Sequence, residues 1–170
     1  MITELYKISI REEACLNSLI TIEGTIEEKN LKIEKSNIPE KYNQIFKQYS
    51  ELAAFNIEAL KRAVFFLWYS RVEPFFITGM NFENEKKSVN NVIKLLDKMI
   101  IENKLDREFK TMLNHYSNWD FLFADLSNYG NFYNYIEQNK NAEITLENIN
   151  EMKDRGELGN YWKSLKKNRS

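Results

Sequence analysis

The chain has 170 residues, of which 43% are hydrophobic and 14% aromatic, and 24 basic against 25 acidic residues give a net charge of −1. This length fits a single domain over residues 1–170, and the nearly balanced charge offers no positive field that would attract nucleic acid. Only five glycines and two prolines are present, whereas all-β folds need frequent turns built from those residues. We therefore expect an all-α protein, a single-domain helical bundle or short helical stack of about six to seven helices.

Residues 10–35 carry the first apolar pattern, which has two interpretations. Ser9 and Glu12 fit a capping box, and the apolar residues after them recur at alternating spacings of four and three, which predicts one long helix. The alternation and the β-branched residues between 20 and 33 favour a β-hairpin around Lys29 and Asn30 instead. We prefer the helix because its spacing continues through the proposed turn, and the hairpin stays as the alternative.

The densest apolar stretch of the chain lies at residues 56–73 and predicts the central helix. A shorter helix precedes it, from Pro39 to about Leu52. Pro39 marks its start, because proline at the first helical position costs no hydrogen bond. The central helix is apolar on most sides, as a helix inside a bundle is, and Pro74 ends it. Its main apolar stripe consists of Ile57, Leu60, Val64, Leu67 and Trp68.

The second half of the chain predicts four further helices and one or two docked turns near the C-terminus. Residues 83–102 carry an apolar stripe of helical period. Asp106 caps the next helix, which should pack beside the 83–102 helix because the connection between them is short. From Trp119 to about Asn139 the spacing predicts another long helix. A short helix is expected over residues 145–155 and should stop at the glycine that follows it. One or two docked turns should then follow, carried by Leu158, Tyr161, Trp162 and Leu165.

The residue types that build metal and nucleotide sites are scarce. His115 is the single histidine and Cys15 the single cysteine, so the clusters of a transition-metal site and an intramolecular disulfide are excluded. The glycines are scattered, so no phosphate-binding loop of the usual kind can form. We expect neither a metal nor a cofactor.

The N-terminal sequence and the composition predict where the protein acts. The first five residues lack the basic and apolar regions of a signal peptide. The central helix is too short and too charged at its start to span a membrane. With one cysteine, these features favour the cytoplasm. The frequent Asn, Lys and Ile residues are typical of an AT-rich, bacterial genome.

Polar residues on the central helix form the best candidate site for a ligand. Arg62, Tyr69 and Glu73 share one stripe of the helix, which suits binding of a small polar ligand or positioning of a proton. His115 and Asp120 are the further candidates for this site. Each feature also has a structural interpretation. Arg62 pairs with the glutamate one turn earlier, His115 lines the end of a helix, and Asp120 caps a helix.

Aromatic residues mark a second candidate surface, for a protein partner. Phe121, Phe132 and Tyr135 fall away from the core stripe of the predicted 119–139 helix and alternate with asparagines. Aromatic and amide side chains together are typical of protein-recognition surfaces. The alternative is that these rings pack beneath the aromatic pair near the C-terminus.

The sequence therefore predicts a protein that acts mainly by binding a protein partner or itself, for example a bacterial antitoxin or immunity-type inhibitor, rather than an enzyme. The alternative is an enzyme or a small-ligand-binding helical protein that uses Arg62, Tyr69 and Glu73. An enzyme needs polar groups that converge in a pocket, whereas a binding module presents a broad surface. The tertiary arrangement of these residues distinguishes the two.

Overall fold

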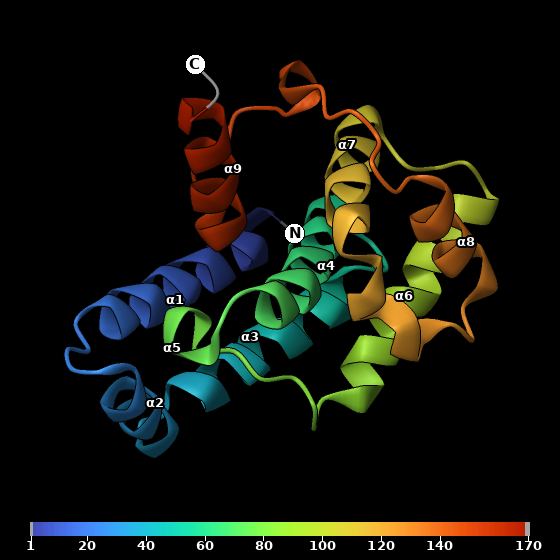
Figure 1. Cartoon of the computed structure of the whole chain (residues 1–170). Helices are drawn as coiled ribbons and strands as arrows, with labels where there is room; N and C mark the ends of the chain where they lie inside the picture. Colours follow the sequence, from blue (N-terminus) through green and yellow to red (C-terminus); the bar gives the residue numbers. More distant parts are fainter. Residues whose placement is uncertain (1, 169–170) are drawn as a thin grey trace.

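The computed structural model describes residues 2–168, although not the side chains of residues 2, 3, 121 and 168. Within this range the regular structure consists of nine α-helices and two 3-10 helices, without a strand (Figure 1). The prediction of an all-α protein is confirmed, and the helices are more numerous than expected. Their bounds are α1 (Ile2–Ile20), α2 (Ile26–Lys35), α3 (Ile38–Leu52), α4 (Ile57–Val72), α5 (Phe75–Thr78), α6 (Lys86–Ile101), α7 (Arg107–Tyr116), η1 (Ser117–Leu126), α8 (Gly130–Gln138), η2 (Leu146–Asn148) and α9 (Gly156–Asn168).

Helix α4 forms the centre of the molecule, as its sequence predicts. Every residue from 59 to 68 is buried, and the helix packs against α3, α6, η1 and α9. It begins after Asn56, whose side-chain oxygen accepts hydrogen bonds from the backbone N–H groups of Glu58 and Ala59. Pro74 follows directly after its C-cap and prevents the helix from continuing. The densest apolar stretch of the sequence thus becomes the core.

The N-terminal region differs from both interpretations of its sequence. Two separate helices, α1 and α2, replace the single helix and the hairpin considered for residues 10–35. The turn between them contains Gly24, whose φ of +131° is a conformation that L side chains rarely adopt. The capping box forms after this turn, where Thr25 and Glu28 cap each other's backbone N–H groups. Ser9 lies inside α1, so its predicted role as an N-cap is wrong.

The C-terminal part differs from its prediction because the backbone leaves the helical conformation at Trp119 and again at residues 127–129. The 3-10 helix η1 and the α-helix α8 replace the single helix expected over residues 119–139. The backbone of Trp119 is non-helical (φ −120°, ψ 47°), and its indole packs edge-to-face on Trp68. Residues 145–155 are largely irregular around the short η2. Gly156, with a φ of +57°, begins α9 rather than ending a helix.

Helix α9 lies against α1 and α4, so the end of the chain returns to its beginning (Figure 1). The buried apolar cluster extends from Ile8 in α1 to Trp162 in α9. No helix within residues 2–168 is long and apolar enough to cross a membrane.

Candidate functional site

A groove of about 1240 Å³ opens where α2, α3, α4, α6 and η1 meet. Its lining combines buried apolar side chains with asparagines, and we call it the amide groove. The buried apolar residues are Leu67, Met80, Phe82, Val89 and Leu126, and the asparagines are Asn30, Asn43, Asn81, Asn84 and Asn90.

Two of these asparagines have a buried side-chain oxygen without a hydrogen bond. Oδ1 of Asn30 on α2 and Oδ1 of Asn43 on α3 have no partner among the described residues. Leaving a buried acceptor unpaired costs about 1–3 kcal/mol. Because both oxygens are themselves buried, a bound molecule can donate hydrogen bonds to them, and recover this free energy, only after the asparagine side chains rotate towards the groove. Together with the exposed amides of Asn81, Asn84 and Asn90, these two residues indicate that the amide groove takes a ligand.

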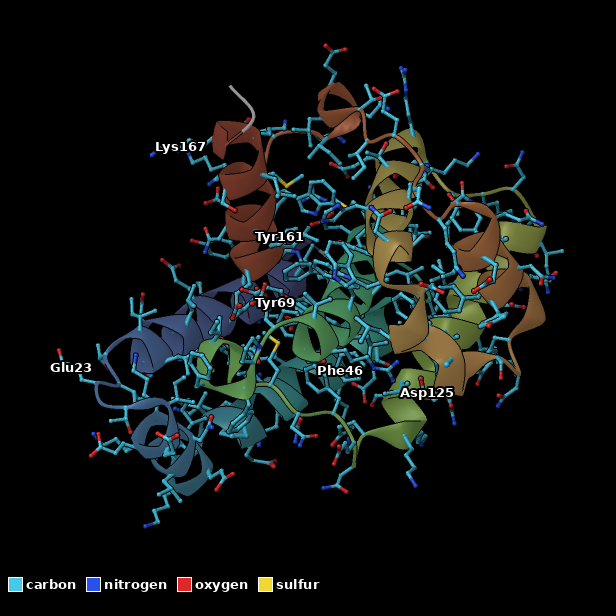
Figure 2. All side chains as sticks on the ribbon, in the orientation of Figure 1. Glu23, Phe46, Tyr69, Asp125, Tyr161 and Lys167 are labelled. Atoms are coloured by element: carbon cyan, nitrogen blue, oxygen red, sulfur yellow. The ribbon has the colours of Figure 1, made fainter. Side chains whose placement is uncertain are left out.

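A salt bridge fixes one side of the amide groove. Nη1 and Nη2 of Arg71 donate to the two carboxylate oxygens of Asp125, each at 2.9 Å, and Nη1 also donates to the carbonyl of Leu122. Such a two-pronged contact fixes orientation as well as distance. It ties η1, which carries Asp125 in Figure 2, to α4.

A set of buried ion pairs lies apart from the amide groove. Arg155 donates to both carboxylate oxygens of Glu58 and of Glu108, at distances from 2.5 to 3.1 Å. Lys61 pairs with Glu108 at 2.6 Å and with Asp106 at 2.7 Å. Burial by itself would raise the pKa of Glu108, but hydrogen bonds from Arg155 and Lys61 lower it to about 2. These contacts join α4, α7 and the segment before α9.

Two buried carboxylates meet where α9 begins. Glu12 accepts hydrogen bonds from the backbone N–H of Glu157 and from the hydroxyl of Tyr49, both at 2.5 Å. The carboxylate of Glu157 accepts a hydrogen bond from the hydroxyl of Tyr42. Burial and the neighbouring Glu12 raise the pKa of Glu157 to about 8, and burial also raises the pKa of Glu12. Protonation of this pair is therefore sensitive to pH near neutrality.

Arg62 connects these carboxylates to the ion pairs. Its Nε donates to Glu58 at 2.9 Å, which is the pairing that the sequence predicts, and its Nη1 donates to the hydroxyls of Ser9 and Tyr49. Nη2 donates to the carbonyl of Asp154 at 3.1 Å. We call the connected set the charge network, and it consists of Glu12, Tyr42, Tyr49, Glu58, Lys61, Arg62, Glu108, Arg155 and Glu157.

Tyr69 and His115 meet in an aromatic cluster rather than beside Arg62. Tyr69 stacks on Phe65, with 4.9 Å between ring centroids, and burial raises its pKa to about 12. The ring of Tyr161 packs edge-to-face against Tyr69, and Figure 2 shows the two between α4 and α9. The hydroxyl of Tyr161 lies 2.5 Å from Nε2 of His115. Tyr161 thus brings two of the predicted ligand-site residues together.

Glu73 and Asp120 lie at other places. Glu73 occupies the C-cap of α4, where its backbone N–H donates to the carbonyl of Tyr69 at 3.0 Å. Asp120 lies within η1 and forms an ion pair with Lys140 at 2.6 Å. The five residues of the predicted ligand site therefore occupy the charge network, the aromatic cluster, the C-cap of α4 and the interior of η1. All five lie outside the lining of the amide groove.

The aromatic surface predicted for a partner is largely internal. Phe132 has no exposed surface and packs edge-to-face on Phe123, because α8 lies against both α6 and η1. The prediction that Phe132 contacts a partner is therefore wrong. Tyr135 is half-buried and its hydroxyl donates to Asn114 at 2.8 Å. The side chain of Phe121 lies outside the part of the structure that is described.

Most of the charge network has no local signal in the sequence. The one available signal is that Glu58, Lys61 and Arg62 lie in a helix that is apolar on most sides, so their charges must be paired in the interior. Their partners are distant, since Glu108 follows Lys61 by 47 positions and Arg155 follows Glu58 by 97. The amide groove likewise gathers asparagines from α2, α3, α6 and the loop before α6.

Among the described residues, no group of three or more His, Cys, Asp or Glu side chains is placed to hold a metal ion. Comparisons with models of protein families, with curated proteins and with solved structures found no match to this chain. What the protein does therefore has to be inferred from its own residues.

Proposed function

We propose that this protein binds a polypeptide partner and that the amide groove takes an extended segment of that partner. The observation that carries this proposal is the lining of the amide groove, where five asparagines, three of them exposed (Asn81, Asn84 and Asn90), lie beside buried apolar side chains. A side-chain amide presents both a donor and an acceptor, as a peptide unit does. Asparagines along a groove therefore bond to an extended main chain whatever side chains it carries.

The size and lining of the amide groove favour a polypeptide over a small molecule. Pockets for small molecules usually enclose about 300–1,000 Å³, and this groove has about 1240 Å³. Its buried apolar residues, among them Leu67, Met80 and Phe82, offer contacts for apolar side chains of the bound segment. Such anchors concentrate the free energy of binding in a few positions.

The charges along the amide groove indicate the character of the segment. Arg71 and Asp125 neutralise each other through their salt bridge. The remaining charged residues of the lining are two carboxylates, Glu34 and Glu83, and one cation, Lys86, which leaves one negative charge. The segment that fits this groove is therefore apolar at its anchors and neutral to weakly basic elsewhere.

The lining of the amide groove favours binding over catalysis. His115 and Cys15 are the single residues of their kinds, and both lie outside the groove lining. A hydroxyl nucleophile there, such as that of Ser70, would have no imidazole base beside it. The function that fits is that of an inhibitor of the antitoxin or immunity type, which acts by occupying its partner. A bacterial, cytoplasmic setting is supported by the single cysteine and by the composition rich in Asn, Lys and Ile.

Selection of peptides from a displayed library on the full chain tests this proposal. Selected segments should be extended, should carry apolar anchors and should shift the NMR signals of residues lining the amide groove. Asn43→Leu should weaken their binding by about tenfold or more while preserving the fold, because it removes an unpaired acceptor. Asn134→Leu is the matched control, since Asn134 is exposed on α8 outside the groove. Its affinity should equal that of the wild type.

Two results would overturn the proposal. One is that selected peptides shift signals elsewhere and bind Asn43→Leu as tightly as the wild type. The other is that a small molecule or a second copy of the chain, rather than any peptide, protects the amide groove.

A further inference from the structure

The charge network contains one more carboxylate than cation. Its three cations bond directly to two of its carboxylates, since Arg155 donates to Glu58 and Glu108, Lys61 to Glu108, and Arg62 to Glu58. Lys61 pairs in addition with Asp106, an exposed carboxylate outside the network as defined. The remaining two carboxylates lie at the start of α9. Neither receives a hydrogen bond directly from a cation within the described residues. Because an isolated charge is costly to bury, one of these two groups is expected to be neutral.

Of these two groups, Glu12 is better suited to hold the negative charge. The hydroxyl of Tyr49 donates to Glu12 at 2.5 Å and accepts from Nη1 of Arg62 at 3.2 Å, which relays a positive charge to Glu12. Glu12 also accepts the N–H of Glu157, at the positive end of α9. The bond to the carboxylate of Glu157 comes from Tyr42, a neutral hydroxyl. Glu157 is therefore the group that carries the proton.

We propose that Glu157 is a proton-dependent latch, which holds its proton while α9 is docked on α1 and whose deprotonation weakens that docking. Deprotonation places a second negative charge beside Glu12 in a buried site, and the two carboxylates repel each other. Release of α9 separates them and exposes Glu157 to water.

The groups closest to Glu157 are neutral or acidic, while the cations Lys41 on α3 and Arg11 on α1 act on the neighbouring Cys15 and are not among the groups that shift the pKa of Glu157. Helix α1 contributes Glu12 and the thiol of Cys15, α3 contributes Tyr42, and α4 contributes Tyr69. Arg155, two residues earlier in the chain, is already bonded to Glu58 and Glu108. Among the described residues that face it, no free cation is therefore positioned to compensate an ionised Glu157.

A cleft of about 250 Å³ between α1 and the start of α9 reaches Glu157 from solvent. Its exposed charged residues are Glu13, Lys153, Asp154 and Lys163. These two carboxylates and two amines balance each other, and water and salt screen them. The cleft thus brings solvent to the start of α9, beside the residue whose proton the latch exchanges.

The pH range of the latch follows from the burial of Glu157. Burial and Glu12 raise the pKa of Glu157 to about 8 in the docked state, from an ordinary value of 4.5. Exposure on release returns the pKa towards 4.5, so docking takes up a proton. The protonated carboxyl group stabilises docking fully below about pH 4.5. Above that pH the equilibrium constant for docking of α9 falls by up to tenfold per pH unit, and it levels off above about pH 8. The raised pKa of Glu12 acts in the same direction.

A titration of the full-length wild-type protein followed by carboxyl ¹³C NMR tests the latch directly. The resonance of Glu157 should titrate near pH 8. A midpoint near the ordinary glutamate value would overturn the proposal, and this measurement requires no variant.

Hydrogen exchange tests the consequence for α9. Between about pH 6 and pH 8 the protection factors of α9, corrected for intrinsic exchange, should fall by tenfold or more relative to those of α4. Glu157→Gln should remove this fall, because its amide is neutral and keeps an acceptor for the hydroxyl of Tyr42. Glu13→Gln is the matched control, an exposed residue of the same cleft, and should behave as the wild type. An unchanged pH profile in Glu157→Gln, or an equally flat one in Glu13→Gln, would refute the latch.

Discussion

The carboxylate of Glu12 accepts the backbone N–H of Glu157 at 2.5 Å, although 145 positions separate the two residues in the chain. Helix α1 thereby caps α9, which begins at Gly156. A carboxylate at a helix N-terminus pairs an N–H group that has no partner within the helix and interacts favourably with the helix dipole. The burial of Glu12 and the position of α9 thus depend on the same contact.

Gly156→Ala should destabilise the protein by about 2 kcal/mol or more. The φ of Gly156 is +57°, and a Cβ there would lie 2.1 Å from an oxygen of Glu12. Gly130→Ala is the control, because a Cβ at Gly130 meets nothing within 4 Å, and it should change the free energy of unfolding by less than about 0.5 kcal/mol. Urea unfolding of both variants measures the difference. Equal effects would mean that Glu12 does not pack tightly against the start of α9.

Lys61→Met should cost about 3 kcal/mol, because it leaves the buried carboxylate of Glu108 with fewer positive partners. The side chain of Lys61 is 4% exposed and lies 2.6 Å from Glu108. Lys98→Met removes an exposed lysine whose amine lies 3.9 Å from Glu102 and should cost about 0.5 kcal/mol or less. Chemical denaturation should therefore separate the two variants clearly. Matching midpoints would show that the Lys61 pair is no stronger than a surface pair.

Acid should destabilise the protein through Glu108. Hydrogen bonds from Arg155 and Lys61 outweigh burial and lower the pKa of Glu108 to about 2 in the fold. A lowered pKa means that the stabilisation is complete above the ordinary value of 4.5 and is lost as the pH falls towards about 2. Unfolding free energies measured across this range should fall less steeply in Glu108→Gln. An identical acid slope in that variant would assign the effect to other carboxylates.

Phe132→Ala should destabilise the folded chain by about 3–5 kcal/mol, as the loss of a fully buried aromatic ring does. Phe132 is 0% exposed, whereas Phe55 is 77% exposed, so Phe55→Ala should change stability by about 0.5 kcal/mol or less. Thermal unfolding of the two variants compares a core ring with a surface ring of the same type. If Phe132→Ala had the same melting temperature as the wild type, the ring would belong to the surface rather than to the core.

The features that the sequence alone determined are those with short-range causes. Scarce glycine and proline excluded frequent turns, which predicted the all-α class. The central helix α4 was predictable because its apolar residues recur at helical spacing. Asn56 caps it by accepting hydrogen bonds from the backbone N–H groups two and three residues later. Asp106 caps α7 through the N–H of Phe109 at 2.7 Å, as predicted. Each of these signals acts within a single turn or helix, so the local sequence is sufficient.

Tertiary structure decided every feature whose free energy depends on distant neighbours. The apolar spacing over residues 119–139 was compatible with one helix, whereas the chain turns at residues 127–129, where the backbone of Tyr129 leaves the helical region (φ −95°, ψ 77°). The buried charge of Lys61 is compensated by Glu108, which lies in another helix. The amide groove exists only where α2, α3, α4, α6, η1 and the loop before α6 bring their polar and apolar side chains together. No local pattern encodes such features, because the stability of a buried charge or ring depends on the groups that folding places around it.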